Sequence, residues 1–444
     1  MILISVQNAA KSFGIHQVFA DVSFSLQKGE KMGLVGANGS GKTTLMRLIS
    51  GQEQPDSGAI HLSKDLRIGY LAQLGDLDPS DTVWESVRKV FEPVIALEQR
   101  LREVEKEMEI AGEDPGEALR LAGEYQRLTE RFNQMEGYAY EGEMLGVLSG
   151  LGLPPLFHDR KVNTLSGGER TRLSLAKLLL QKPDVLLMDE PTNHLDLEAI
   201  EWLQQYLTDY KGSLLLISHD RYFLDHVCTT MGELLGGKLI KFTGNYTEYM
   251  RKRTADFETR MKAYNLQQKE IEREQAIIRR YRSFNREKSI RAAESRQKRL
   301  DKIERLDKPM EEEQVRFSFD VHRRSGEEAL EVKGLEKSFE GKKVFENLSF
   351  SLRTGDRVAL IGPNGVGKST LFKILMNRLT PDKGSVKYGV NIDVGYYDQH
   401  QQDLNTQHTV LDEVWNAFPS LEQSRVRGAL GLFLFSGDDV FEKI

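Results

Sequence analysis

Two stretches of the chain combine glycine, lysine and hydroxyl residues in a spacing that could bind phosphate. The ranges 36–43 and 362–369 each hold a glycine, four further residues, then glycine, lysine and a hydroxyl residue. The glycines allow backbone N–H groups to turn toward phosphate oxygens, the lysine adds positive charge, and the hydroxyl can bind Mg²⁺. One copy could be a glycine-rich surface turn, but two copies favour a pair of phosphate-binding loops. The residues expected to contact nucleotide are Gly36, Ala37, Asn38, Gly39, Ser40, Gly41, Lys42, Thr43 and Thr44 in the first loop and Gly362, Pro363, Asn364, Gly365, Val366, Gly367, Lys368, Ser369 and Thr370 in the second.

A pair of carboxylates closes an apolar run further along the chain. Residues 185–188 predict a strand buried on both faces, and Asp189 and Glu190 follow it. The carboxyl end of such a strand is where an α/β sheet binds its ligand. Asp189 is placed to bind Mg²⁺, directly or through water, and Glu190 to orient and deprotonate an attacking water. The alternative, a helix cap before Pro191, is disfavoured because two acids closing a buried run need a cation or a water network.

A second anion site could begin at the stretch Leu165-Ser166-Gly167-Gly168-Glu169, which precedes a run of helical periodicity. The serine and the glutamate have the spacing of an ordinary capping box. The two glycines would also let an anion approach the N-terminus of the helix. Both interpretations stay open on the sequence.

One histidine follows a predicted strand in the same way as the carboxylates. His219 comes after the apolar run 214–217. Most histidines in such a position are structural, but its place at the sheet edge that carries the phosphate site favours a contact to the terminal phosphate.

These groups need a parallel sheet with helices to bring them together. The run 32–35 predicts a strand before the first loop, and 45–49 predicts a helix after it. This strand, loop and helix order is the context that a phosphate-binding loop requires. The sequence therefore predicts an α/β fold.

The chain also contains an internal duplication. Lys11–Gln73 aligns with Lys337–Gln399 at a constant offset of 326 and without a gap. A repeat of this size indicates two homologous lobes and not a solenoid. The expected domains are 1–244 for the first lobe, with a helical insert at about 92–136, 245–309 for a linker and 310–444 for a partial second lobe.

The linker predicts a basic helical hairpin. No proline or glycine occurs from Asn245 to Lys308, and apolar residues such as Ile271 and Ile278 recur at coiled-coil spacing. Folded back near 283–285, each helix would have about 30 residues and reach about 45 Å. The range 251–308 holds 19 Lys and Arg against 10 Asp and Glu, a net charge of +9, whereas the whole chain has −6. A solvated spacer needs no such excess, so we expect RNA contact.

The predicted turn of this hairpin concentrates the basic residues. Glu287 is the only acidic residue from 279 to 291. Tyr281 and Phe284 lie in the same stretch, so base stacking could join the charge contacts to phosphate. The residues expected to bind RNA are Arg279, Arg280, Arg282, Arg286, Lys288 and Arg291.

Composition limits the class of protein. The chain has 444 residues, 39% hydrophobic and 29% charged, and no apolar run near the 18 residues of a membrane span. Its N-terminus lacks the pattern of a signal peptide, and Cys228 is its single cysteine, which excludes an internal disulfide. These features predict a cytoplasmic protein.

Together the motifs resemble the ATP-binding cassette family over the whole chain. The range 36–43 resembles the Walker A loop, 165–169 the signature, Asp189 and Glu190 the end of Walker B, and 193–196 the D-loop. The resemblance implies P-loop cassette lobes in tandem, with ATP and Mg²⁺ as ligands and hydrolysis of ATP to ADP and phosphate as the reaction. Ser166, Gly167 and Gly168 would contact ATP from the signature.

The same resemblance assigns roles to residues outside these motifs. Phe13 and its counterpart Phe339 match the aromatic residue that stacks on adenine, and His219 matches the switch histidine. Gln73 and Gln399 match the glutamine of the Q-loop. The implied catalytic residues are Glu190, His219 and Gln73, and the implied metal ligands are Thr43, Gln73, Asp189, Ser369 and Gln399.

The helical insert and the basic linker between two cassettes resemble the ABC-F branch, whose members act on the ribosome during translation. In that branch the insert resembles the arm, and the linker resembles the hairpin that reaches toward the P-site tRNA. The resemblance implies the ribosome as partner, through rRNA and P-site tRNA.

The second lobe departs from the family pattern. It has Phe339, the second loop and Gln399, but no second signature, Walker B end or switch histidine before Ile444. Because cassettes of this family place each nucleotide between the Walker A loop of one lobe and the signature of the other, neither composite site would be complete. We therefore expect a fragment of a longer protein with little steady-state ATPase activity by itself.

Three alternatives remain. A transporter ATPase subunit would explain the cassettes but leaves the basic hairpin without a purpose. A DNA-repair ATPase would place its coils within one cassette and not between two. A regulatory module that binds ATP without hydrolysis would fit the incomplete composite sites. Sedimentation with ribosomes separates the interpretation as a ribosome-binding ABC-F protein from these three alternatives.

Overall fold

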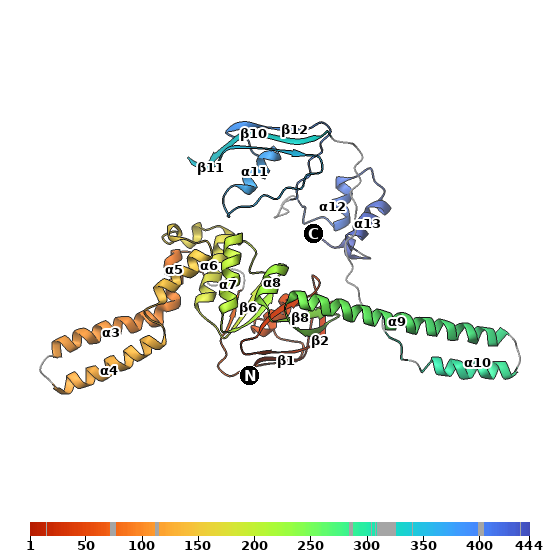
Figure 1. Ribbon diagram of the computed structural model, residues 1–444, viewed down its shortest axis with the longest axis horizontal. Helices are drawn as coiled ribbons and strands as arrows, with labels where there is room; N and C mark the ends of the chain where they lie inside the picture. The colour runs from red at the N-terminus through yellow and green to blue at the C-terminus, as the bar shows by residue number, and fades with distance from the viewer. Residues whose placement is uncertain are drawn as a thin grey trace. The chain divides into compact units, whose positions relative to one another are not determined.

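The computed structural model divides the chain into two compact units, Met1–Pro309 and Met310–Ile444. Unit 1 contains strands β1 to β9 and helices α1 to α10, and unit 2 contains the remaining elements (Figure 1). The residues that the structure describes are 1–14, 16–71, 77–111, 115–283, 287–302, 304–306, 308, 326–339, 341–397, 404–435 and 437–444.

A six-stranded sheet forms the centre of unit 1. Its order is β5-β6-β7-β3-β8-β9, and neighbouring strands are parallel except for β8 and β9. The inner strands are almost continuous apolar runs because a parallel sheet is covered on both faces. The strands are β3 (Lys31–Val35), β5 (Ile68–Tyr70), β6 (Val185–Asp189), β7 (Ser213–Ile217), β8 (Thr230–Leu235) and β9 (Lys238–Thr243).

A three-stranded antiparallel sheet of order β2-β1-β4 completes the β-structure of unit 1. One core joins side chains of this sheet, of α1 and of the six-stranded sheet, among them Phe19, Met46 and Leu215. The helix that follows the first phosphate loop is therefore fixed between two sheets. These elements are β1 (Ile2–Phe13), β2 (His16–Gln27), β4 (Ser57–Leu62) and α1 (Lys42–Ile49).

Helices cover the other face of the six-stranded sheet. A second core contains Leu173 of α6, Leu203 of α7 and Leu214 of β7, all fully buried. This core orients the elements that carry the signature and the carboxylates. The helices are α2 (Val83–Arg88), α5 (Tyr140–Gly150), α6 (Gly167–Leu180), α7 (Leu197–Asp209) and α8 (Arg221–Val227), with 3-10 turns η1 (Lys89–Phe91), η2 (Pro155–Phe157) and η3 (Val162–Thr164).

The predicted helical insert is a pair of helices, α3 (Glu92–Ala111) and α4 (Pro115–Gln134), which run side by side (Figure 1). Val104 and Leu121 are buried between them, with 0% and 2% of their surface exposed. The two helices therefore pack along their apolar faces.

The linker is a hairpin of α9 (Tyr246–Ser283) and α10 (Glu287–Leu300). Its apolar seam is confirmed, because Ile271, Ile278 and Leu300 are buried together with Ala293. The prediction of two helices of about 30 residues was wrong, since α9 has 38 residues and α10 has 14.

The reason for the short second helix lies in one side chain of α9. Gln267 donates from Nε2 to the carbonyl of Glu304 at 2.8 Å and accepts the N–H of Leu306 at 2.8 Å. This amide therefore binds the returning chain through backbone groups that a longer α10 would use within the helix. Pro309 also disfavours a helical conformation at the residue before it.

Unit 2 has a three-stranded sheet of order β11-β10-β12, which packs against α11 through Leu335, Leu371 and Ile374. In the part of the unit that the structure describes, residues 357–361 form no strand, although their counterpart β3 lies in the middle of the unit 1 sheet. In unit 1, β3 pairs with β7 and β8. The elements of unit 2 are β10 (Glu328–Phe339), β11 (Lys342–Arg353), α11 (Lys368–Leu375), β12 (Lys383–Tyr388), α12 (Val410–Ala417), α13 (Gln423–Leu432) and the 3-10 turn η4 (Asp439–Phe441).

These elements confirm the predicted α/β fold class, with two lobes and a long helical linker between them in sequence. Among the described helices, none is long and apolar enough to cross a membrane.

Candidate functional site

The first phosphate loop connects the end of β3 to the start of α1. Gly36 has a φ of 155°, and a Cβ there would lie 2.6 Å from the carbonyl oxygen of Leu234. Gly41 has a φ of 95°, and its Cβ would lie 2.4 Å from Cγ1 of Val18. Both positions therefore require glycine, for conformation and for space. The first glycine is held against β8, and the last against β2.

Two side chains of this loop point to an anion as its ligand. Lys42 donates from Nζ to the carbonyls of Gly36 and Ala37 at 2.8 and 3.0 Å, which keeps the ammonium group over the loop. The hydroxyl of Ser40 is buried, and it has no hydrogen-bond partner among the residues that the structure describes. A buried hydroxyl without a partner costs free energy, so a phosphate oxygen would satisfy it.

The order of the strands brings the predicted metal ligands of the two segments together. Thr43 lies at the start of α1, and Asp189 ends β6, two strands away from β3 in the sheet. The hydroxyl of Thr43 donates to Oδ2 of Asp189 at 2.6 Å. Hydroxyl and carboxylate oxygens are ligands that Mg²⁺ prefers, so this pair fits that ion.

Glu190 has an unusual backbone and an unsatisfied side-chain oxygen. Its φ is 49°, a left-handed conformation that costs about 1–3 kcal/mol in a residue other than glycine and is typical of functional positions. The backbone N–H of His219 donates to Oε2 of Glu190 at 3.3 Å. Oε1 is buried without a hydrogen-bond partner in the described part of the chain, and it lies 3.7 Å from Nε2 of His219. A water molecule would satisfy Oε1.

The environment of Glu190 favours its protonated form. Burial raises the pKa of this carboxyl, against the N–H and the imidazole of His219, which lower it, while the nearby Asp189 adds to the rise. A raised pKa makes a carboxylate a stronger base, which suits proton abstraction from water. In the family pattern this is the role of the general base.

The same shift predicts a stability effect that depends on pH. A carboxyl whose pKa is higher in the folded state stabilises the fold below about pH 4.3 and loses this contribution as pH rises through the folded pKa. Replacing Glu190 with glutamine should therefore raise the melting temperature of the nucleotide-free protein at pH 7 and have little effect at pH 4. Calorimetric scans at the two pH values test this. An equal shift at both would contradict it.

The predicted signature forms the N-terminus of α6. The hydroxyl of Ser166 accepts the N–H of Glu169 at 3.3 Å, and the carboxylate of Glu169 accepts the N–H of Ser166 at 2.7 Å. The capping-box interpretation is therefore confirmed. Burial alone would raise the pKa of Glu169, but the hydrogen bonds with Ser166 lower it. Gly167 is exposed, so an anion could still reach the helix end, and Gly168 lies against His194.

The second loop has the same local geometry in unit 2. Lys368 donates to the carbonyls of Gly362 and Pro363 at 2.6 and 2.7 Å. Gly367 has a φ of 104°, and its Cβ would lie 2.3 Å from Cγ1 of Val344. At the position of Ser40, whose hydroxyl is buried in the first loop, the second loop has Val366, which is 47% exposed.

Other predicted site residues lie apart from the loops or outside the described residues. Phe13 and Phe339 are at the ends of β1 and β10, where 51% and 47% of their surface is exposed. A lysine approaches each ring, a contact that the sequence analysis missed. Gln73 and Gln399, the predicted Q-loop residues, lie outside the described residues.

The hairpin presents part of the predicted RNA-binding set. Arg279, Arg280 and Arg282 are exposed at the end of α9, and Arg291 is exposed on α10. Tyr281 is partly buried and packs against the buried seam of the hairpin, and its role as a base-stacking residue stays a prediction. Its position three residues after Ile278 continues the seam. Arg286, Phe284 and the side chain of Lys288 lie outside what the structure describes.

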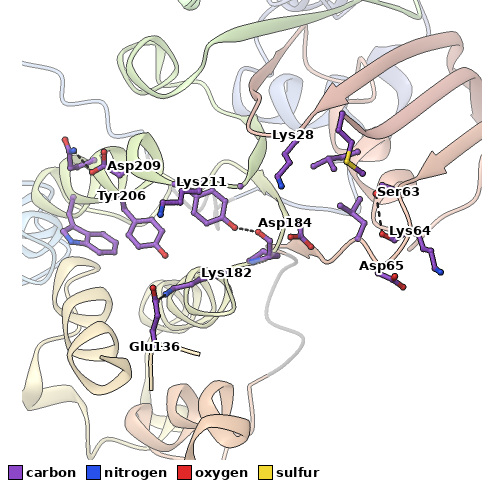
Figure 2. A pocket seen from close by; sticks show the side chains of 18 residues that line it. Lys28, Ser63, Lys64, Asp65, Glu136, Lys182, Asp184, Tyr206, Asp209 and Lys211 are labelled. Carbon is purple, nitrogen blue, oxygen red and sulfur yellow. Dashed lines mark hydrogen bonds and ion pairs between the residues drawn. The ribbon is translucent and has the colours of Figure 1, made fainter. Parts of the chain in front are cut away.

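A separate pocket of about 930 Å³ lies at the opposite edge of the six-stranded sheet (Figure 2). Its lining includes Lys28, Pro183 and Gly212, which precede β3, β6 and β7, whereas the phosphate loop and Asp189 follow or end their strands. Four lysines and four carboxylates line it, so its charge is balanced. Because its charge is balanced, the pocket has no preference for phosphate, and its volume alone does not make it a candidate for the nucleotide site.

Two family models and several known proteins match the chain. A family described as "ABC transporter" matches residues 19–193 and 345–433, and a second family with the same description matches 233–319. The chain is 41% identical to "Putative ATP-binding protein YdiF" of Bacillus subtilis, over 100% of this chain and 69% of that protein.

Two further relatives carry more specific names. The chain is 36% identical to "ABC transporter F family member 5" of Arabidopsis thaliana, over 99% of this chain and 64% of that protein. It is 34% identical to "Energy-dependent translational throttle protein EttA" of Mycobacterium tuberculosis, over 98% of this chain and 77% of that protein. The chain thus spans about two thirds to three quarters of the length of these relatives.

Proposed function

The chain belongs to the ABC-F family of ATP-binding cassette proteins, and on this premise we propose that it is a ribosome-binding ATPase whose nucleotide cycle controls its basic linker hairpin. The observation that carries the proposal is that the elements bearing the predicted nucleotide contacts also hold the root of the linker helix. We place the protein in the cytoplasm, where its proposed partner is. The name of the mycobacterial relative refers to translation and to its dependence on energy.

ATP binding would use the phosphate loops and the aromatic residues at the ends of β1 and β10. Lys42 already lies over the first loop, and Ser40 offers a buried donor. Phe13 would stack on the base. Thr43 and Asp189 would hold Mg²⁺, which when bound would neutralise charge on the phosphates during hydrolysis.

Hydrolysis would depend on Glu190. Its buried Oε1 is available to accept a hydrogen bond from the attacking water, and its raised pKa favours removal of a proton from that water. His219 contacts this carboxylate through its backbone N–H and lies beside it through its ring. The histidine would therefore orient the base and contact the terminal phosphate.

The linker helix α9 is attached to two elements that extend from the site. The helix α8 begins just after His219, and its Asp225 accepts the N–H of Thr247 at the start of α9 at 2.7 Å. The strand β8 contacts the phosphate loop at Gly36, and its Glu233 pairs with Arg253 of α9 at 2.6 Å. Because Glu233 is buried, separating it from Arg253 would leave an uncompensated buried charge, so the pair ties α9 to β8. Movement of either element would be transmitted to the hairpin.

The distal part of the hairpin is the proposed RNA contact. The exposed arginines at the end of α9 lie more than 25 residues from its root, a distance of about 40 Å along a helix. A cluster of exposed arginines binds phosphates without desolvating a core. Ribosomal RNA and the P-site tRNA are the partners that the family implies.

This interface predicts a defined salt dependence. If about five phosphates are neutralised, log K for ribosome binding should fall with log salt with a slope of about −3.5 to −4.5. Replacing the arginines at the hairpin end with glutamine should flatten the slope and weaken binding, with ATP binding unchanged. The variant combines Arg279→Gln, Arg280→Gln, Arg282→Gln and Arg286→Gln.

A matched variant removes the same charge from the root and middle of α9, through Arg251→Gln, Lys262→Gln, Lys269→Gln and Arg273→Gln. It should keep most of the parental slope. If both variants lose the same affinity, the effect belongs to net charge and not to the hairpin end. If the first variant keeps the parental affinity and slope, the proposed RNA contact is wrong.

A further inference from the structure

The aromatic ring at the end of β1 is held by a charged pair from elsewhere in the sequence. Nζ of Lys11 lies 5.6 Å from the ring centroid of Phe13, within cation–π range. The same ammonium group donates to the carbonyl of Gln54 at 2.8 Å and to Oδ1 of Asp56 at 3.3 Å. Oδ2 of Asp56 accepts the N–H of Ser12 at 2.7 Å. One carboxylate thus holds both the lysine and the backbone next to the ring.

Unit 2 repeats this arrangement. Nζ of Lys337 lies 5.5 Å from the ring centroid of Phe339 and donates to the carbonyl of Thr380 and to Oδ1 of Asp382, at 2.9 and 2.7 Å. Oδ2 of Asp382 accepts the N–H of Ser338 at 2.7 Å. The lysine and aspartate positions of the two units differ by 326, the offset of the duplication. The same set of contacts therefore occurs in two units that fold around separate cores.

The burial of the two partners shows which one is constrained. The side chains of Lys11 and Lys337 are 15% and 11% exposed, whereas those of Asp56 and Asp382 are 48% and 42% exposed. The lysines are thus covered, and their ammonium groups are fixed by three acceptors or neighbours instead of moving in solvent. A largely buried cation beside the ring fixes the orientation of the ring. About half of the surface of each phenylalanine stays exposed.

The strand that pairs with each aromatic residue contacts the phosphate loop of its own unit. In unit 1, Phe13 pairs with His16 across the β1–β2 hairpin, and Val18 of the same strand contacts the position of Gly41. In unit 2, Phe339 pairs with Lys342, and Val344 contacts the position of Gly367. In each unit, the residue that pairs with the aromatic residue therefore lies two positions before the valine that contacts the loop.

We propose that Lys11 with Asp56, and Lys337 with Asp382, are positioning residues that hold the aromatic ring where it can stack on the base of a nucleotide. The term Lys–Asp clamp denotes these two pairs. The inference rests on the proposed function, because it requires nucleotide at the phosphate loops. It adds that base recognition in each unit depends on a clamp that contacts neither the phosphates nor the base.

The test compares a ligand that has a base with one that has only phosphates. Affinities for Mg-ATP and for inorganic tripolyphosphate are measured by calorimetry in a Lys368→Ala background, so that the first loop alone reports. Asp56→Asn and Lys11→Met should each weaken ATP binding about three- to tenfold, because a stacked aromatic contact of this size is lost in part. Tripolyphosphate binding should not change.

Two controls make the test specific. Asp81→Asn removes the partner of Lys89, an ion pair of 2.6 Å in the same unit, and should change neither affinity. In a Phe13→Ala background, Asp56→Asn should cause no further loss of ATP affinity, because both changes remove the same contact. Lys11→Met keeps Asp56 bonded to the N–H of Ser12, so it tests the clamp if Asp56→Asn disturbs folding.

The clamp is supported if the substitutions weaken the binding of ATP but not of tripolyphosphate, and if Asp56→Asn causes no further loss of ATP affinity in the Phe13→Ala background. Unchanged ATP affinity, an equal loss for both ligands, or an additive loss in the Phe13→Ala background overturns it. If the parent protein binds neither ATP nor tripolyphosphate, the proposed function itself fails, and that result is distinct from failure of the clamp.

Discussion

Replacing Glu190 with glutamine is expected to slow the hydrolysis of bound ATP roughly 100-fold or more while leaving ATP binding in place. Glutamine keeps the size and hydrogen-bonding reach of the side chain but cannot accept the proton of the attacking water. The rate is measured in a single turnover with radiolabelled ATP, because this isolates the chemical step from nucleotide exchange. Affinity is measured in parallel by calorimetry.

The matched control is Glu198→Gln, which removes an exposed carboxylate in the first turn of α7. It should hydrolyse ATP at the parental rate. A Glu190→Gln variant that also keeps this rate would show that another group activates water. A variant that loses ATP affinity would show instead that Glu190 acts in binding.

The second large effect concerns the lysine of the first loop. Lys42→Ala in a Lys368→Ala background should weaken Mg-ATP binding on the order of tenfold to hundredfold, because a charged contact to phosphate is lost. The comparison is with Lys368→Ala alone, measured by calorimetry. Lys28→Ala, at the opposite edge of the sheet, serves as the control and should have no effect. An unchanged affinity in Lys42→Ala would remove the first loop from the nucleotide site.

The parts of the fold that follow from local patterns were predicted from sequence. The strand before the first loop, the strand that ends at Asp189 and the seam through Ile271 and Ile278 all lie where apolar periodicity placed them. The end of α10 could not be predicted this way. It depends on hydrogen bonds between Gln267 and a segment almost 40 residues later, and no local pattern encodes such a contact.

In the candidate site, too, some features could be predicted from the sequence and others depend on contacts that no local pattern shows. Residue types and their places after predicted strands indicated that Thr43 and Asp189 belong to one site, and the structure brings them within hydrogen-bond distance. The left-handed backbone of Glu190, and its side-chain oxygen that has no hydrogen-bond partner among the described residues, could not be inferred, because they depend on the neighbouring β7 strand and His219. Asp56 was missed although the duplication repeats it at Asp382. Its signal was a pair of lysine and aspartate positions that are 45 residues apart within each unit.

The capping box at Ser166 does not exclude a phosphate contact at the start of α6. Its hydroxyl and N–H are both used within the helix terminus. The exposed glycine that follows it would still allow phosphate contact through the backbone. A role for this segment in nucleotide binding therefore depends on backbone groups more than on the serine hydroxyl.

ATP is expected to control ribosome binding through the linker hairpin. The most direct measurement is sedimentation of the Glu190→Gln protein with purified ribosomes through a sucrose gradient, with and without ATP. ATP should increase the fraction that sediments with ribosomes, and glutamine substitution of the hairpin arginines should abolish this increase without loss of ATP binding. Sedimentation that is absent in both conditions, or that is the same with and without ATP, would contradict it.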